Sequence, residues 1–376
     1  MKVIIWQNML SHLQSAHVRG LSDRGIDVMI VGLDELSPER RALGWSVPDF
    51  GRARTMASPT WEQALTLVRE SGRGIHILAG WRGMRYGKRL LAELERRSAR
   101  IGLLTEGCDG RGWRGLMRRS VYWKDALIHR TRLDFILAVG TQGAGWFRQC
   151  GYPAGKLFPY GYVTEQPPVS DVSSRDGDVV ELIYLGQCVR RKGLDIALRA
   201  LAGMRRLRWR LSVIGSGPAA QSWRQLAERL GIAARVSFAS ALPYNDAMAR
   251  LAESDLLLLP SRYDGWGAVV NEALMLGVPA VCSDACGAKD LLWEGWRGEV
   301  FRSGSASALR TILEARIAGG RLNTEAMQRV QRWSRCLGGD SGAEYILSVI
   351  KHVYGGGPRP VAPWMAESVI EKMCTV

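Results

Sequence analysis

Three consecutive cations follow an apolar run and a glycine turn near the middle of the chain. The run Ile183–Leu185 leads into Gly186-Gln187, and Arg190-Arg191-Lys192 then precede Gly193 and a helical pattern. Ligands of α/β proteins bind in the crevice outside the carboxyl ends of the strands, which is where these side chains are expected. Guanidinium and ammonium groups in that place suit a diphosphate. The alternative is an exposed turn whose long cationic side chains bind nothing.

Two acids lie eight residues apart behind a later apolar run. Asp264 follows the expected strand Asp255–Leu259, and Glu272 is expected about two turns into a helix that begins near Gly267. Gly265 and Gly267 let the backbone pass close to a ligand. The start of the helix favours an anion, and the Glu272 carboxylate suits the diol of a ribose. The alternative is that both acids are merely exposed.

Gly215-Ser216-Gly217 follows another apolar run and opens a helix, so this turn could approach a phosphate or a nucleotide. It lacks the third glycine of the dinucleotide fingerprint, which argues against NAD binding. Gly87-Lys88 and Gly155-Lys156 lack both the first glycine and the hydroxyl residue of a P-loop. No G-x-S-x-G elbow is present, so a serine hydrolase has no support.

Three polar residues of the first half are candidates for a second substrate. His12 and Gln14 lie at a strand-to-helix turn, where they either face a cleft or cap the helix. Glu106 ends the expected strand Ile101–Thr105 and precedes Gly107, and carboxylates at strand ends are often functional. Glu106 is therefore a candidate for a cleft residue.

The elements that must position these residues alternate between short apolar runs and longer helical patterns. The runs are almost continuously apolar, which is typical of strands buried on both faces of a parallel sheet. The expected strands are Lys2–Trp6, Val28–Gly32, Gly74–Ala79, Ile101–Thr105, Phe135–Gly140, Val179–Gly186, Leu211–Gly215, Val236–Ala239, Asp255–Pro260 and Pro279–Ser283. Helices are expected between them, among others at Leu194–Met204, Ala219–Leu230 and Ala268–Leu276. The pattern predicts an α/β fold with two doubly wound domains.

The chain of 376 residues is long enough for two domains. Turn formers concentrate near 160–178, which predicts domains at 1–165 and 178–354, with 355–376 as a candidate to complete the first. No apolar run approaches the ~18 residues of a membrane span, and the N-terminus is not a signal peptide, so we expect a cytoplasmic protein. The seven cysteines and five histidines form no zinc pattern, and no metal site is expected.

The net charge of +15 is unevenly distributed. Residues 82–132 contain 14 basic and 5 acidic side chains. Such a region attracts a polyanion, whether nucleic acid, an anionic membrane or a phosphorylated substrate. A nucleic-acid-binding protein is one hypothesis, but no helix-turn-helix, zinc or RNA-recognition signature accompanies the charge. The bland alternative is a solvated basic surface.

From Leu185 to Leu291 the sequence resembles the retaining glycosyltransferases of the GT-B fold, of the family-4 type. The resemblance rests on Gly186 with Arg191-Lys192-Gly193, on Gly215-Ser216-Gly217, and on Asp264 followed by seven residues and Glu272. It implies two Rossmann-like domains that face each other across a cleft. It also implies transfer from a UDP- or GDP-linked sugar with retention of configuration, without a metal or another cofactor.

The resemblance also implies roles for individual residues. Arg191 and Lys192 would hold the donor diphosphate and act in catalysis, and Glu272 would bind the ribose. Asp264, a further catalytic candidate, and the amides of Gly265-Trp266-Gly267 would lie against the donor sugar, and Phe238 near the nucleobase. Gln187 stands where the family often has Arg, and Asp264 where it usually has Glu. The family's catalytic histidine has no clear counterpart, which leaves Glu106 as the catalytic candidate of the first domain.

The expected activity is transfer to a lipid-linked or glycan acceptor in bacterial cell-surface polysaccharide or glycolipid synthesis. His12, Gln14 and Glu106 would lie on the acceptor side. The basic region 82–132 would hold the protein against the inner face of the cell membrane. Two alternatives keep the fold: a soluble natural-product glycosyltransferase, and a partner subunit whose donor site has degraded at Gln187 and Asp264.

Overall fold

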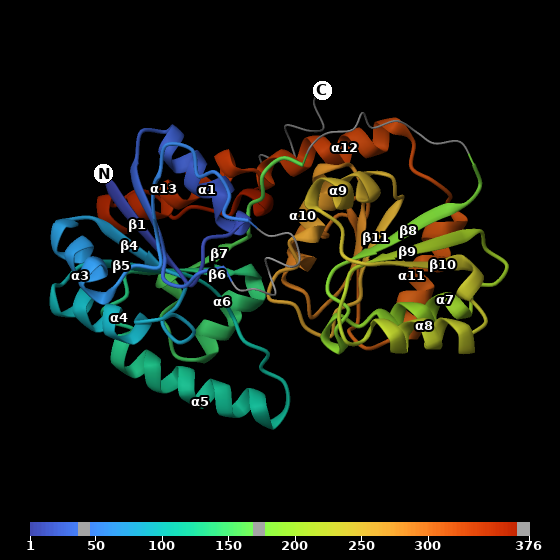
Figure 1. The fold of residues 1–376 in the computed structure, drawn as a ribbon, viewed down its shortest axis with the longest axis horizontal. Helices are drawn as coiled ribbons and strands as arrows, with labels where there is room; N and C mark the ends of the chain where they lie inside the picture. The colour runs from blue at the N-terminus through green and yellow to red at the C-terminus, as the bar shows by residue number, and fades with distance from the viewer. Residues whose placement is uncertain (37–45, 168–176, 367–376) are drawn as a thin grey trace. The chain divides into compact units, whose positions relative to one another are not determined.

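The computed structural model describes residues 1–36, 46–167 and 177–366, which form two compact units (Figure 1). The N-terminal unit consists of Met1–Glu165 and Cys336–Ala366, and the C-terminal unit of Gln166–Arg335. Residues 367–376 of the segment proposed to complete the first domain lie outside the described residues.

The N-terminal unit is built on a parallel sheet of seven strands in the order β3-β2-β1-β4-β5-β6-β7. Its strands are β1 (Lys2–Gln7), β2 (Asp27–Gly32), β3 (Arg54–Ala57), β4 (Ile75–Leu78), β5 (Arg100–Glu106), β6 (Phe135–Val139) and β7 (Leu157–Tyr160). Its helices are α1 (His12–Asp23), α3 (Trp61–Glu70), α4 (Gly87–Arg96), α5 (Gly112–His129), α6 (Gly140–Gln149) and α13 (Gly339–Gly355). Side chains of α3, α4, α5 and α6 share one apolar core with the sheet, and α1 and α13 pack together.

Helix α13 corrects the predicted domain boundary. Residues 336–354 were expected in the second domain, but the chain returns there to the N-terminal unit. Glycines allow a close crossing of α13 and α1, because a Cβ added to Gly20 would lie 2.6 Å from the carbonyl oxygen of Gly339. Arg24 and Asp340 form an ion pair of 2.6 Å across the same crossing.

The C-terminal unit is built on a parallel sheet of six strands in the order β10-β9-β8-β11-β12-β13. Its strands are β8 (Val180–Leu185), β9 (Trp209–Ile214), β10 (Val236–Ala239), β11 (Leu256–Leu259), β12 (Ala280–Ser283) and β13 (Gly298–Phe301). Its helices are α7 (Leu194–Ala202), α8 (Ala220–Arg229), α9 (Tyr244–Ala252), α10 (Val269–Met275), α11 (Ala306–Ala318) and α12 (Thr324–Ser334). Helices α7, α8 and α11 cover one face of the sheet, and α9, α10 and α12 the other (Figure 1).

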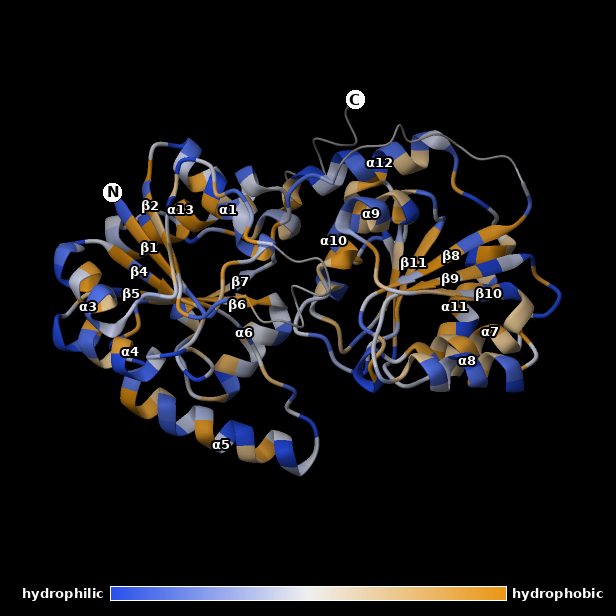
Figure 2. Ribbon diagram, in the orientation of Figure 1, coloured by the Kyte–Doolittle hydropathy of each residue, from blue (hydrophilic) through white to orange (hydrophobic). Residues whose placement is uncertain are grey.

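The strands of both sheets are the apolar centre of each unit (Figure 2). The ten strands predicted from continuous apolar runs are confirmed. Three edge strands were not predicted, namely β3, β7 and β13. An edge strand has one neighbour and tolerates polar residues or Pro, as in the exposed β3 and in Pro159 of β7. Within the described ranges, no helix combines the length and the apolar character needed to cross a bilayer.

Candidate functional site

The sheet of the C-terminal unit has one position where the direction of strand addition reverses. The chain runs from β8 outward to β9 and β10, then returns to place β11 on the other side of β8. The loops that follow β8 and β11 therefore leave the same edge of the sheet on either side of this switch point, where open α/β sheets bind their ligands. These two loops carry most of the residues singled out in the sequence.

The loops bring the predicted cations and the first predicted acid together. Lys192 Nζ donates to Asp264 Oδ2 at 2.5 Å, and Arg191 Nη1 lies 3.7 Å from Asp264 Oδ1. The side chains of Lys192 and Asp264 are only 15% and 11% exposed, whereas Arg191 is 46% exposed. Arg191 also donates to the carbonyl of Tyr263 at 2.9 Å. The site thus holds two cations and one carboxylate, with Arg191 turned toward solvent.

A second set of contacts joins the two loops rigidly. Arg262 donates two hydrogen bonds of 2.7 Å to the carboxylate of Asp195, and its backbone N–H donates to the carbonyl of Arg191 at 2.7 Å. Gly193 has a φ of 68°, and a Cβ there would lie 2.1 Å from the carbonyl oxygen of Pro260. Only glycine allows this approach, so Gly193 fixes where the cations stand relative to Asp264.

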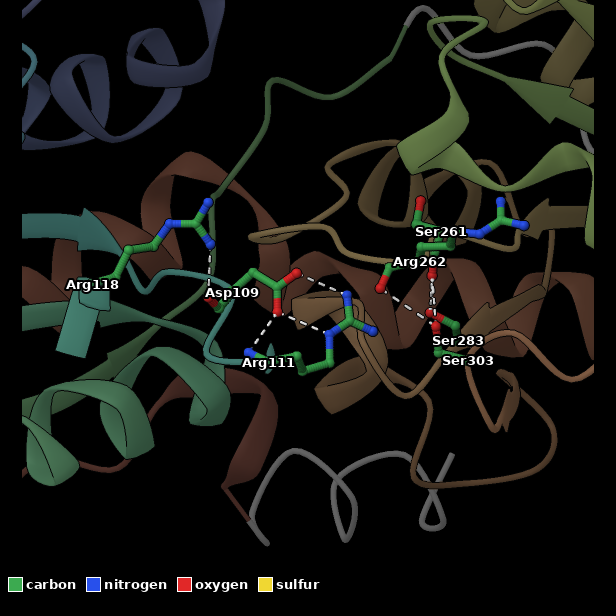
Figure 3. A network of polar contacts seen from close by, with 7 residues as sticks. All are labelled: Asp109, Arg111, Arg118, Ser261, Arg262, Ser283 and Ser303. Atoms are coloured by element: carbon green, nitrogen blue, oxygen red, sulfur yellow. Dashed lines mark hydrogen bonds and ion pairs between the residues drawn. The ribbon is translucent and has the colours of Figure 1, made fainter. Parts of the chain in front are cut away.

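Ser283 and Ser303 hold the backbone of the loop after β11 in place. The Ser283 hydroxyl donates to the carbonyl of Ser261 at 2.5 Å, and Ser303 Oγ lies 3.4 Å from the carbonyl oxygens of Ser261 and Arg262 (Figure 3). The Ser261 hydroxyl in turn donates to Asp264 Oδ2 at 3.3 Å. Ser283 ends β12 and Ser303 follows β13. The position of Asp264 in the loop after β11 therefore depends on two segments that are distant from it in sequence.

The predicted glycine turns lie against each other at the same edge of the sheet. A Cβ on Gly215 would lie 1.9 Å from the carbonyl oxygen of Gly186, and a Cβ on Gly217 would lie 2.5 Å from that of Cys188. Both Gly215 and Gly217 have φ near 150°, where other residues are strained. Packing of backbone on backbone is therefore sufficient to explain these glycines.

Glu272 lies elsewhere in the helix than predicted. Helix α10 starts at Val269, so Glu272 is in its first turn and not two turns along. Its carboxyl group is buried, and burial raises its pKa to about 7. Burial is the sole cause of this shift, and no side chain among the described residues forms a hydrogen bond or ion pair with this carboxyl group.

The remaining donor-site candidates differ in exposure. Trp266 is fully buried and donates from Nε1 to Asn271 Oδ1 at 2.9 Å, so its side chain belongs to the interior of the unit. Gly265 and Gly267 on either side of it are buried as well. Phe238 is half-buried at the edge strand β10 beneath the guanidinium of Arg224. Gln187 is exposed, and its carbonyl accepts a hydrogen bond from the Tyr184 hydroxyl at 2.7 Å.

The N-terminal unit contains a cavity of about 310 Å³ at the carboxyl end of its sheet. It brings Gln14 and Glu106 together, but His12, the first residue of α1, does not line it. The Gln14 carbonyl oxygen also accepts from the backbone N–H and the hydroxyl of Ser11, so this side chain both caps α1 and faces the cavity. The lining consists of Gln7, Asn8, Met9, Ser11, Leu13, Gln14, His17, Ala79, Gly83, Met84, Leu104, Thr105, Glu106 and Tyr162.

Two lining residues were missed in the sequence. His17 is buried, neither ring nitrogen has a partner, and burial lowers its pKa to about 4. Tyr162 forms a hydrogen bond with Glu106. His17 lies three residues after Gln14 and therefore on the same face of α1, which was a usable signal. Tyr162 gave none, because it lies in the segment interpreted as a linker. Across the described parts of the chain, no cluster of three or more His, Cys, Asp or Glu side chains has the arrangement of a metal site.

The region that contains Arg191, Lys192 and Asp264 is similar to known proteins. Residues 167–331 match the family model of glycosyl transferases group 1. A stretch of 146 residues is 31% identical to the GDP-mannose-dependent alpha-(1-6)-phosphatidylinositol monomannoside mannosyltransferase of Mycolicibacterium smegmatis. That match covers 36% of this chain, and the chain spans only 38% of the length of this relative.

Two solved structures match almost the whole chain. The Anabaena protein Alr3699/HepE in complex with UDP superposes with a TM-score of 0.69 at 13% identity, over 94% of this chain and 100% of that one. The lipopolysaccharide outer core galactosyltransferase WaaB also gives 0.69, at 14% identity, over 94% of this chain and 99% of the other. The chain has the GT-B fold. The predicted fold class is thereby confirmed, and the sheet that carries the cations lies within the region that matches the family model.

Proposed function

We propose that the chain is a glycosyltransferase that moves a sugar from a nucleoside diphosphate sugar to an acceptor hydroxyl. The proposal depends chiefly on the cluster of Arg191, Lys192 and Asp264 at the switch point of the C-terminal sheet. This cluster lies inside the region that matches glycosyl transferases group 1. One relative is named for GDP-mannose and one solved neighbour holds UDP, which supports a UDP- or GDP-linked donor.

In the proposed reaction the bond between the anomeric carbon and the diphosphate breaks, a bond to the acceptor oxygen forms, and the acceptor hydroxyl loses its proton. The departing diphosphate gains negative charge. Arg191 and Lys192 stabilise that charge electrostatically, so the reaction needs no metal. Asp264 and the backbone of Gly265–Gly267 lie beside the donor sugar. Retention of configuration, as in the family-4 type, is proposed from the resemblance of the motifs.

The nucleoside of the donor is proposed to lie toward Glu272, whose buried carboxylate accepts hydrogen bonds from the ribose diol. Gly186, Gly215 and Gly217 shape the turn beneath it, and Gln187 and Phe238 lie at its rim. Binding of the diol favours the ionised carboxylate, because hydrogen bonds to a charged group stabilise its charged form.

The cavity of the N-terminal unit is proposed as part of the acceptor site. It offers the exposed Glu106, bonded to Tyr162, as the group that takes the acceptor proton, with Gln14 as a further contact. His17 would meet the acceptor as a neutral imidazole. We propose a lipid-linked or glycan acceptor of bacterial cell-surface polysaccharide or glycolipid synthesis. The names of the mannosyltransferase and of the galactosyltransferase relatives support that class.

Thermal unfolding in the presence of UDP, GDP, ADP or TDP, each with and without Mg²⁺, tests the donor site. A nucleotide at 100 times its dissociation constant stabilises the protein by about 2.7 kcal/mol. One of the four is expected to raise the midpoint without Mg²⁺. If no nucleotide shifts the midpoint, the donor site is degraded and the partner-subunit alternative replaces the enzyme. A shift that requires Mg²⁺ contradicts the metal-free mechanism.

A further inference from the structure

Helix α5 exposes its large apolar side chains and buries almost none of them. Only Gly115, Asp125 and Ala126 of its 18 residues are buried. Seven large apolar side chains are between 39% and 66% exposed, namely Trp113, Leu116, Met117, Val121, Trp123, Leu127 and Ile128. At 100° per residue these seven fall within an arc of roughly 160° opposite the buried residues. An ordinary surface helix has its apolar face inward, so α5 is reversed.

This apolar face is a local feature of α5. Of the thirteen large hydrophobic side chains that are exposed in the described residues, seven belong to this one helix and the other six are scattered. Single exposed hydrophobic residues are normal, whereas a contiguous set marks an interaction surface.

The charges around the apolar face are positive. Arg114, Arg118 and Lys124 are exposed on α5, Arg111 precedes the helix, and Arg130 and Arg132 follow it. The helix contains a single acid, Asp125, which is buried and accepts two hydrogen bonds of 2.7 and 2.6 Å from Arg82.

Asp109, just before the helix, is neutralised by its neighbours. Its carboxylate accepts from Nε and Nη2 of Arg111 at 2.8 and 2.9 Å, and its carbonyl from Arg118 at 2.9 Å (Figure 3). The hydrogen bonds from Arg111 hold the pKa of this carboxyl group below its usual value. The surface therefore offers cations around an apolar strip, with Asp109 and Asp125 already paired.

We propose that α5 lies flat on an anionic lipid bilayer, with its apolar face at the boundary of headgroups and acyl chains and its cations at the lipid phosphates. Apolar side chains including Trp, flanked by Lys and Arg, are the composition of an interfacial helix. A second copy of the same face would bring like charges together, so charge complementarity favours the bilayer over self-association. The inference rests on the proposed function only for its setting, since a lipid-linked acceptor has to be met at a membrane.

Flotation of the full chain with vesicles tests this surface. We expect binding to phosphatidylcholine vesicles that contain 30% phosphatidylglycerol, and much weaker binding to pure phosphatidylcholine. The double variant Trp113→Ser/Leu116→Ser should weaken binding more than tenfold, because each side chain loses its apolar burial. The double variant Arg114→Gln/Lys124→Gln should weaken it about fivefold for each charge removed.

Matched controls use residues of similar exposure in the C-terminal unit. Trp293 is as exposed as Trp113, so Trp293→Ser should float like the wild type. Arg206→Gln/Arg229→Gln removes the same charge from exposed positions of the C-terminal unit and should also have little effect. All these side chains are exposed, so the folded state should persist, which the thermal midpoint of each variant verifies.

Three results would overturn the proposal. The wild type does not float with anionic vesicles; the α5 variants float like the wild type; or light scattering shows a dimer that Trp113→Ser/Leu116→Ser dissociates, while vesicles are not bound. The nucleotide-induced thermal shift, measured on the same variants, distinguishes a failure of the membrane surface from a failure of the donor site. Flotation without any nucleotide shift refutes the donor site alone, and a nucleotide shift without flotation refutes the membrane surface alone.

Discussion

Replacing Glu272 by Gln is expected to remove a pH dependence from both the stability of the C-terminal unit and its affinity for nucleotide. The structure buries this carboxyl group without a cationic partner, which raises its pKa from 4.5 to about 7. Gln has nearly the same shape and does not titrate. The pair of proteins therefore isolates one ionisation in an otherwise unchanged unit.

The sign of the stability effect follows from proton binding. Between pH 4.5 and 7 the folded protein holds the Glu272 proton and the unfolded chain does not, so the free energy of unfolding falls as the pH rises through this window. From pH 5 to pH 8 the loss is about 2.5 kcal/mol, since one pKa unit corresponds to about 1.4 kcal/mol. The Glu272→Gln variant should lack this loss, and its advantage over the wild type should grow with pH.

The affinity for nucleotide should rise with pH, in contrast to the free energy of unfolding. The ribose diol stabilises the carboxylate, so the wild type must release the Glu272 proton when it binds below pH 7. Its affinity should rise about tenfold more than that of the variant between pH 6 and pH 8. Calorimetric titration at pH 7 in two buffers of different ionisation enthalpy should report about half a proton released by the wild type and less by the variant.

A chain of two units need not unfold in one step. The stability of the C-terminal unit should therefore be read from the thermal transition whose midpoint rises when nucleotide is added. His17 and His76 of the N-terminal unit, whose pKa values burial lowers to about 4, give a slope of the other sign between pH 4 and 6.5. That slope is common to both proteins and cancels in their difference. Identical pH dependence of stability and of affinity in the two proteins would refute both the buried ionisation and the ribose contact.

Two further substitutions test the cluster and the turn beneath it. Lys192→Ala should abolish the nucleotide-induced thermal shift and destabilise the unit by about 3 kcal/mol, because Asp264 stays buried with only the more distant Arg191 as a cationic partner. A normal thermal shift in this variant would show that Lys192 does not bind the donor. Gly215→Ala should lower the thermal midpoint and cost more than about 2 kcal/mol, since its Cβ would overlap the carbonyl of Gly186. Gly295→Ala, where a Cβ meets nothing within 4 Å, is the control, and equal midpoints for the two would contradict the packing argument.

The parallel sheets were predictable because their central strands are buried on both faces, so a short apolar run is sufficient to mark each one. The same rule places the residues after two such strands at one edge, which is why Arg191 and Asp264 could be expected together. The edge strands β3 and β7 were not predictable in this way, since half of their surface faces solvent and their composition resembles that of loops.

Long-range contacts account for the other differences. The assignment of α13 to the N-terminal unit depends on its close crossing with α1, and nothing local to residues 336–354 indicates it. The late start of α10 also has a distant cause, because Asp264 is bridged to Cys286 and Ala288 donates to the carbonyl of Trp266. These contacts keep the residues up to Ala268 outside the helix, which places Glu272 in its first turn.

The ion pair of Lys192 and Asp264 connects the two positions at which this sequence departs from the pattern that it resembles, Gln187 and Asp264. The buried carboxylate of Asp264 holds the half-buried ammonium of Lys192 at 2.5 Å, so Lys192 is already partnered and Arg191 is the more exposed cation. On the proposed function, an arriving diphosphate must share Lys192 with Asp264 and take its other cationic contact from Arg191. Gln187 adds no charge to help. The shorter Asp264 therefore matters as the partner that sets how much of Lys192 remains for the diphosphate, and donor affinity should depend on this acid as much as on the cations.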